Sequence, residues 1–177
     1  EEIKKTKLPA MITLGIKNKE TLKDGFSVVK ACKILDKKGA DIVGLNCHRN
    51  PSETLPVMKK IRKAVNCFTA CQPVAYRCTA KMKYFQAQEY KGRKAFPLEL
   101  DPFQLSRLDM AEYAKKAKQI GVNYIGSCCG SVADHVRSMA EALGKKGDAF
   151  EFNPDLKAHP IIGVKVKETD KNVLNQS

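Results

Sequence analysis

The repeating order of short apolar runs and amphipathic helix patterns is the feature that most constrains how this chain can fold. Four apolar runs fit that order, at residues 8–16, 41–46, 67–71 and 122–126. Polar and apolar side chains do not alternate within these runs, which indicates strands that are buried on both faces. Buried strands joined by helices are typical of parallel sheets. We therefore predict an α/β fold of about four βα units with parallel strands.

The helix patterns carry signals for where each helix begins and which face it buries. Ser52 is expected to cap the helix that follows the second strand. In the next helix, within residues 105–121, Leu108 is expected to face the core. Ser131 is expected to cap the last helix, whose apolar face includes Val136.

The length of 177 residues suits one domain with a sizeable core. We predict that residues 1–145 form this domain and that residues 146–177, which lack clear periodicity, are a polar and partly disordered tail. The apolar runs are shorter than the ~18–20 residues that cross a bilayer, so no membrane partner is expected. The first residues, EEIKKTK, do not resemble a signal peptide. The sequence begins with Glu1 rather than methionine, so we expect a piece of a longer protein.

Charge and cysteine content limit the class of protein further. The formal net charge is +13, yet the lysines are spread over the predicted helices and both ends, and aromatic residues make up only 7%. A nucleic-acid surface needs basic residues gathered in a patch or a recognisable motif, so no dedicated nucleic-acid partner is expected. Seven cysteines are an odd number in a chain with regular helix patterns. We therefore expect a cytoplasmic, reducing environment.

Three cysteines follow predicted strands. Cys47 comes directly after the second strand, and Cys128 and Cys129 come shortly after the fourth. The carboxyl ends of parallel strands meet at one edge of a sheet. Gly130 gives the backbone after the pair the freedom to turn. In such a turn two adjacent thiolates can face one ion, as they cannot within a strand. Three thiolates with one open position suit a catalytic Zn²⁺ site.

Other interpretations of the adjacent pair remain open at this stage. Cys128 and Cys129 are also small apolar side chains, and free cysteines are often buried in cores. A strained disulfide between the two neighbours is a further alternative.

The remaining cysteines offer weaker candidates for metal ligands. Cys67 and Cys71 could share a zinc only if their segment were not extended, because on a strand they lie ~13 Å apart. Cys32 falls on an apolar helix stripe and Cys78 in a loop, so neither receives a role. His48, beside Cys47, is expected to support the site or lie at the surface.

Three segments together resemble a known family. They are GADIVGLNCHRNP (39–51), CQPVAY (71–76) and SRLDMAEYAKKAKQIGVNYIGSCCG (106–130). They are similar to the betaine–homocysteine S-methyltransferases and, more loosely, to the wider family of zinc-dependent homocysteine S-methyltransferases. The similarity covers roughly residues 8–145. An Asn-Cys-His segment paired with a Gly-x-Cys-Cys-Gly segment, each after a strand, is specific, whereas either one alone would be weak.

The resemblance implies a TIM-type (β/α)₈ barrel whose zinc ligands match Cys47, Cys128 and Cys129. It also implies that the homocysteine thiol is the fourth ligand. A methyl group would pass from a cationic, betaine-like donor to homocysteine and give methionine. No catalytic residue beyond the metal ligands is implied for this stretch of chain, and the residues that bind the rest of homocysteine are not assigned.

Two departures from the family pattern limit these implications. Ser127 stands where the motif usually has glycine, although serine is also small. About four βα units are present where a complete barrel needs eight, so the chain matches only the carboxyl half of the barrel. We expect zinc binding with little or no turnover by this chain alone. It would self-associate or need the missing half-barrel in trans. The alternative is a non-catalytic zinc- or thiol-binding module derived from the family.

Overall fold

Four parallel strands form the central sheet, in the order β1–β2–β3–β6. Their bounds are Met11–Leu14 (β1), Ile42–Asn46 (β2), Phe68–Gln72 (β3) and Tyr124–Ile125 (β6). The computed structural model describes residues 2–145, 147 and 148. All four predicted strands are present, each within about three residues of the expected bounds.

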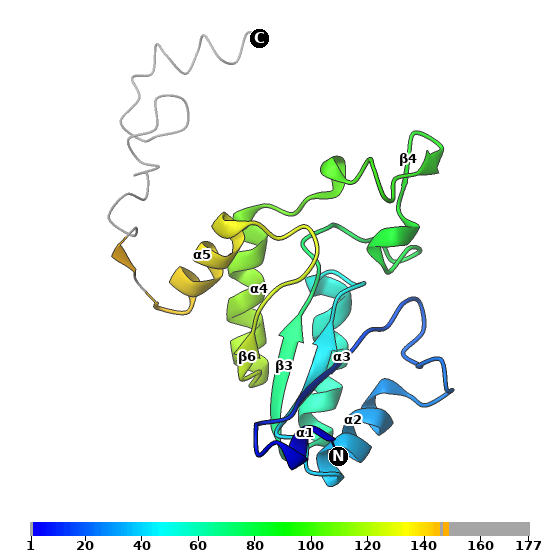
Figure 1. Cartoon of the computed structure of the whole chain (residues 1–177). Helices are drawn as coiled ribbons and strands as arrows, with labels where there is room; N and C mark the ends of the chain where they lie inside the picture. The colour runs from blue at the N-terminus through cyan, green and yellow to red at the C-terminus, as the bar shows by residue number, and fades with distance from the viewer. Residues whose placement is uncertain (1, 146, 149–177) are drawn as a thin grey trace, which may run out of the picture. The chain divides into compact units, whose positions relative to one another are not determined.

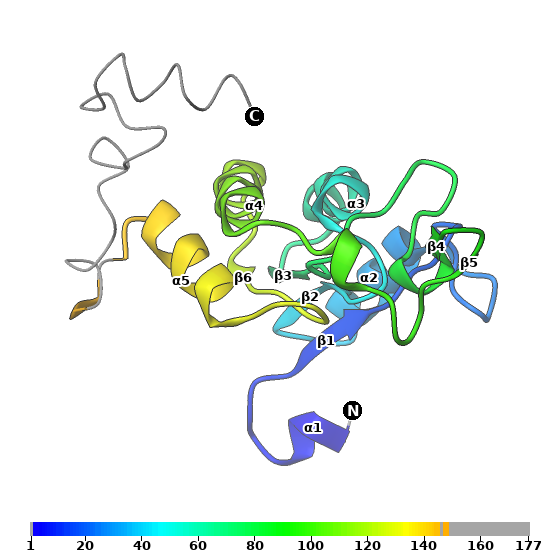
Figure 2. The same cartoon turned by 90° about the horizontal axis from the view of Figure 1, so that it is seen from above.

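A helix follows each strand as the alternating pattern predicts: α2 (Val28–Lys37), α3 (Pro51–Ala64), α4 (Arg107–Ile120) and α5 (Ala133–Ala142). A short helix that was not predicted, α1 (Glu2–Lys5), precedes β1. Successive helices from α2 to α5 pack against one another, and Figure 2 shows α3 and α4 side by side over the strands. The connection from β3 to α4 holds two short 3-10 helices and a small antiparallel pair: η1 (Phe85–Ala87), β4 (Glu89–Tyr90), β5 (Arg93–Lys94) and η2 (Asp101–Phe103). It lies beyond the carboxyl ends of the strands (Figure 1).

The strand register brings the cysteine segments to the same edge of the sheet. Asn46, the last residue of β2, pairs with Gln72 at the end of β3, and Cys71 pairs with Ile125 at the end of β6. Because the three strands end level and run in one direction, the residues that follow them leave the sheet together.

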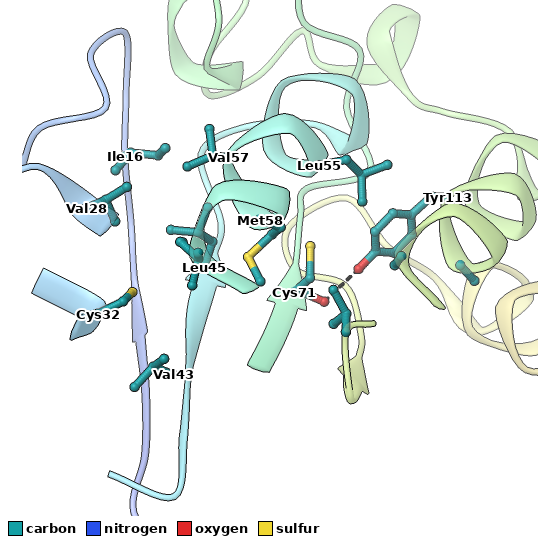
Figure 3. Packing of buried hydrophobic residues seen from close by; sticks show 14 of the residues in the cluster. Ile16, Val28, Cys32, Val43, Leu45, Leu55, Val57, Met58, Cys71 and Tyr113 are labelled. Atoms are coloured by element: carbon teal, nitrogen blue, oxygen red, sulfur yellow. Dashed lines mark hydrogen bonds between the residues drawn. The ribbon is translucent and has the colours of Figure 1, made fainter. Parts of the chain in front are cut away.

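The core lies between the sheet and the helices. Strand residues such as Val43 and Leu45 belong to one buried cluster with helix residues such as Met58 and Tyr113, and Figure 3 shows Tyr113 beside Leu55. Tyr113 is only 1% exposed, and its hydroxyl donates to the carbonyl oxygen of Cys71 at 2.6 Å. This buried hydrogen bond ties α4 to the end of β3.

Four details of the helices differ from the sequence-based predictions. The cap of α3 is Asn50 rather than Ser52, because the Asn50 side chain accepts from the backbone N–H of Glu53 at 3.2 Å. Leu108 is 66% exposed, and α4 instead buries Met110 and Tyr113 together with two alanines.

The last helix also starts differently. The N-cap position of α5 is Val132 rather than Ser131, and the backbone N–H of Val132 donates to Nδ1 of His135 at 3.2 Å. The hydroxyl of Ser131 instead accepts from that of Ser127. Val136 is 55% exposed, whereas His135 and Met139 are buried. The buried stripe of α5 is therefore rotated from the predicted one.

The arrangement is that of a partial TIM-type barrel, as the family resemblance implied. The four-stranded parallel sheet is covered by helices, and the described residues do not close it into a complete barrel. Among those residues, no helix has the length and apolar character required to cross a bilayer. The residues up to Lys145 group into one compact unit. The predicted polar tail, 146–177, lies outside the described residues except for positions 147 and 148.

Candidate metal centre

Cys47 is held in an uncommon backbone conformation directly after β2. Its φ angle is +59° and that of His48 is +58°, so two successive residues with side chains adopt the left-handed region that favours glycine. The backbone N–H of Cys47 donates to the carbonyl oxygen of Gln72 at 2.9 Å, and the N–H of Arg49 donates back to the carbonyl of Cys47 at 2.7 Å. The chain therefore turns sharply at the point where Cys47 leaves the sheet.

Cys128 and Cys129 lie in a turn that follows β6. Gly130 has φ +78°, and the N–H of Ser131 donates to the carbonyl of Cys128 at 3.1 Å. A strand would direct neighbouring side chains to opposite faces. In this turn both sulfur atoms instead approach the sulfur of Cys47.

The three sulfur atoms form one cluster. The Sγ atoms of Cys47 and Cys129 lie 3.6 Å apart, and those of Cys128 and Cys129 lie 3.9 Å apart. All three lie within 4.8 Å of one another. Four ligands at a Zn–S distance of ~2.3 Å in tetrahedral geometry place the sulfurs ~3.8 Å apart. The separations therefore match a shared zinc ion and are far longer than the ~2.05 Å of a disulfide bond.

The cluster is distinct from the other sites that the sequence suggested. Within the part of the chain that the structure describes, it is the one group of three or more His, Cys, Asp or Glu side chains with donor atoms close enough for a metal ion. Cys32 and Cys71 are fully buried in the main core. Cys67 and Cys78 are partly buried free thiols. The structure does not bring Cys67 and Cys71 into a metal-binding group.

One short segment holds both cysteine segments through its backbone. Residues 72–75 run between the two cysteine segments, and their backbone groups form hydrogen bonds to one segment and the other in turn. The carbonyl of Gln72 accepts from Cys47 N–H, and the N–H of Val74 donates to the carbonyl of Arg49. On the other side, the carbonyl of Pro73 accepts from Cys128 N–H, and the N–H of Ala75 donates to the carbonyl of Cys129, each at 2.9 Å. This segment sets the distance between the two halves of the cluster.

A buried arginine supports the turn at Cys47. Arg49 is 2% exposed, and its guanidinium donates to the carbonyl oxygens of Lys17 and Asn18 at 2.6 and 2.9 Å. It therefore fastens the loop after β1 to the segment that carries Cys47. Sequence analysis gave Arg49 no role, because its partners are backbone carbonyls that leave no signal in the sequence.

The long connection of residues 73–104 also supports the cluster. A second apolar core forms there around Val74, Phe85, Ala95 and Leu100, and both Cys47 and Cys128 pack against it. The sequence showed several aromatic residues in this stretch but gave no indication that they lie under the cysteines. His48 lies beside the same region, with its Nδ1 atom 3.3 Å from Oε1 of Gln86.

Burial favours the neutral thiol form of Cys47 and Cys129 when no cation is present. Burial raises the pKa of Cys47 from 9.0 to about 12, and burial likewise raises the pKa of Cys129. A divalent cation among the three sulfurs would offset this cost by pairing with the thiolates. The donor set and its spacing therefore fit zinc, which binds thiolate rather than thiol.

Two hollows of about 390 and 720 Å³ lie along helices α3 and α4 rather than at the cysteines. Leu55, Ser52 and Lys116 line both of them. None of the three clustered cysteines lines either hollow.

The fold and the cysteine cluster define the class of this protein. It is part of a parallel α/β barrel with a three-thiol site at the carboxyl ends of its strands. The sequence model of the family described as homocysteine S-methyltransferase matches residues 1–143. The chain belongs to this family.

Curated relatives point to the same family. Betaine–homocysteine S-methyltransferase 1 of Mus musculus is 37% identical over 114 residues, which are 62% of this chain and 27% of the mouse protein. The Xenopus tropicalis protein of the same name is 32% identical over 148 residues, 81% of this chain and 36% of that protein. The S-methylmethionine–homocysteine S-methyltransferase of Mus musculus is 29% identical over 150 residues, 81% of this chain and 39% of that protein. The chain thus spans well under half the length of these relatives.

Proposed function

We propose that the protein formed with these residues transfers a methyl group from a cationic, betaine-like donor to homocysteine and produces methionine. Cys47, Cys128 and Cys129 would hold one Zn²⁺ ion. The observation that carries the proposal is the convergence of three sulfur atoms, from segments about 80 residues apart, to within 4.8 Å of one another in a chain of the homocysteine S-methyltransferase family.

Methyl transfer needs a nucleophilic sulfur on homocysteine and a donor whose nitrogen becomes neutral when the methyl group leaves it. The homocysteine sulfur forms a bond to the methyl carbon while the bond from that carbon to the donor's cationic nitrogen breaks. The electron pair of the broken bond stays on the nitrogen, which leaves as a neutral amine. The homocysteine thiol must lose its proton first, because the thiolate is the nucleophile.

The three cysteines are suited to this chemistry. Zinc, when bound, would supply the positive charge that lowers the pKa of the homocysteine thiol. Three protein thiolates carry one more negative charge than the divalent ion neutralises, so the site favours a cationic donor over a neutral one. Cys129 is exposed, whereas Cys47 and Cys128 are partly buried, so the cluster is open on the side of Cys129, where a substrate could approach.

The described residues supply only part of a complete active site. β1 and β6 are the outer strands of the sheet. Tyr124 in β6 is 47% exposed, and Val132, at the start of α5, is 50% exposed. We propose that a further half-barrel covers this side and contributes the groups that bind the amino-acid end of homocysteine and the donor. Self-association of this chain is the other way to cover an open sheet edge. The free thiols also suit a reducing, cytoplasmic compartment.

A metal analysis combined with a methyl-transfer assay tests this proposal. The purified chain should hold about one equivalent of zinc and form little methionine alone. Addition of the amino-terminal half-barrel of a relative should restore transfer of labelled methyl from betaine to homocysteine. Failure of the chain to bind zinc would refute the metal site.

A second candidate is a zinc- or thiol-binding module without catalysis. The three-thiol cluster would bind zinc whether or not methyl transfer follows. Stoichiometric zinc with no methionine, even when the other half-barrel is supplied, would support this candidate and refute the enzymatic proposal.

A further inference from the structure

A pair of stacked aromatic rings lies between the two cysteine segments. The rings of Tyr76 and Phe85 have centroids 5.4 Å apart and planes inclined by 19°. Both residues come from the connection of residues 73–104. We infer that Tyr76 is a positioning residue of the metal centre, which acts with Phe85 to fix the turn at Cys128 and Cys129 relative to Cys47. The inference deepens the proposed function and rests on its zinc site.

Tyr76 makes its contact with the turn at Gly130. A Cβ atom placed on Gly130 would lie 2.6 Å from Cε2 and 2.7 Å from Cζ of the Tyr76 ring. The ring therefore fills the space beside the residue that follows Cys129. The same turn is held by Gln104, whose Nε2 atom donates to the carbonyl of Gly130 at 2.9 Å. Because the glycine has no side chain, the ring and the turn are in direct contact.

Phe85 makes the matching contact on the other side. Its backbone N–H donates to the carbonyl oxygen of His48 at 2.8 Å, and its ring is 4% exposed within the second core. His48 follows Cys47 in the pair of left-handed residues. A continuous path of contacts thus runs from Cys47 and His48 through Phe85 and Tyr76 to the turn of the adjacent cysteines.

The Tyr76 ring, rather than its hydroxyl, makes these contacts. Among the described residues the Tyr76 hydroxyl has no hydrogen-bond partner. Phe85 is also fixed by an edge-on contact with Phe96, with centroids 5.7 Å apart and planes at 82°. A metal site requires its ligands to be held within about 0.5 Å, and packed residues outside the ligand set provide this support. Loss of the ring would free the turn and spread the three sulfur atoms.

Substitution of Tyr76 in the full 177-residue chain tests the inference through metal binding. Tyr76→Leu should weaken zinc binding about 10-fold, measured by competition with a chelating dye. It should also shift and broaden the absorption bands of the Co²⁺-loaded protein, which report the geometry of the thiolates. Tyr76→Phe keeps the ring and should retain zinc affinity within about twofold. Val28→Ala, in the main core rather than in the second core against which Cys47 and Cys128 pack, controls for a general loss of stability.

A glycine pair provides a second test, which decides the matter if Tyr76→Leu does not fold. Gly130→Ala would drive a methyl group into the Tyr76 ring, whereas Gly39→Ala, with a similar φ of +85°, meets nothing within 4 Å. Gly130→Ala should therefore weaken zinc binding about 10-fold or more, and Gly39→Ala should leave it within about twofold.

Unchanged zinc affinity and Co²⁺ spectra in Tyr76→Leu, or in Gly130→Ala where Tyr76→Leu does not fold, would overturn the inference while leaving the proposed function intact. A parent chain that binds no zinc would instead refute the proposed metal site.

Discussion

The sulfur atoms of Cys47 and Cys129 lie 3.6 Å apart although 82 positions separate the two residues in the sequence. Each cysteine follows a different strand. The backbone N–H of Cys47 donates to the carbonyl oxygen of Gln72, and the N–H of Ala75 donates to the carbonyl oxygen of Cys129, so the segment between the two cysteines holds both backbones. The distance is therefore set by the sheet and by one shared segment, rather than by local sequence. This arrangement leads to specific predictions about metal binding, pH and stability.

Serine substitution should separate the three clustered cysteines from the others. Cys47→Ser, Cys128→Ser and Cys129→Ser should each remove most of the bound zinc, because a serine hydroxyl does not ionise near neutral pH and is a much poorer ligand than thiolate. Zinc content after dialysis against a chelator measures the effect. Cys78→Ser and Cys32→Ser are the controls and should keep the metal. Full retention of zinc by Cys129→Ser would contradict a three-thiolate site.

Zinc affinity should rise with pH. Burial raises the pKa of Cys47 to about 12 and also raises the pKa of Cys129, so both side chains are protonated near neutral pH and must release protons to bind the metal. Competition titrations between about pH 6.5 and about pH 8.5 should show binding that tightens steadily. An affinity independent of pH would show that the thiols are not the ligands.

The stability of the metal-free protein should fall at alkaline pH, whereas the affinity for zinc rises with pH. The folded state holds the pKa of Cys47 above its ordinary value of 9.0, at about 12. The stability that comes from keeping this thiol neutral is complete below pH 9 and is lost as the pH rises towards 12. Urea unfolding of the metal-free chain should show a falling midpoint over this range, and Cys47→Ala should reduce the fall. An identical pH dependence in both proteins would contradict the assignment to Cys47.

Asn50→Ala should destabilise the fold, and Ser52→Ala should not. The Asn50 side chain caps α3 by accepting from the N–H of Glu53, and loss of such a cap costs about 1 kcal/mol. Ser52 is exposed and donates only to the Asn50 side chain. Urea unfolding midpoints of the two variants measure the difference. Equal destabilisation would show that Ser52 shares the capping role.

Tyr113→Phe should lower stability by about 1 kcal/mol, because it removes a buried hydrogen bond to the carbonyl oxygen of Cys71, which still accepts from the backbone N–H of Gly126. The Tyr113 hydroxyl lies within hydrogen-bond distance of the carbonyl oxygens of Cys71 and Gly126, at 2.6 and 3.1 Å. Tyr124→Phe, at an exposed position, is the matched control and should change the free energy of unfolding little. A neutral effect of Tyr113→Phe would contradict a stabilising role for this hydrogen bond.

The order of strands and helices could be predicted because it depends on hydrophobic runs. The ends of β2 and β3 fall within one residue of prediction, which is why Cys47 was correctly expected at the carboxyl edge of the sheet. The buried face of α4 was harder to predict than the order of the elements, since Leu108 and Met110 both suit an apolar helical stripe. Tertiary packing against Cys71 and Gly126 selects the face with Tyr113 and exposes Leu108.

The supports of the cysteine cluster could not be predicted in the same way. Residues 72–75 act through backbone groups, which every residue but proline carries in full. Cys47 and His48 adopt positive φ angles that residues with side chains rarely adopt. The stacking of Tyr76 on Phe85 depends on the path of a long connection with little periodicity.

X-ray absorption at the zinc edge of the purified, zinc-loaded chain tests whether Cys47, Cys128 and Cys129 hold one zinc ion. We expect at least three sulfur neighbours at ~2.3 Å, falling by one in Cys129→Ser if that variant retains any metal. A first shell made of nitrogen and oxygen, or a sulfur count that Cys47→Ser and Cys129→Ser both leave unchanged, would contradict this three-thiolate site.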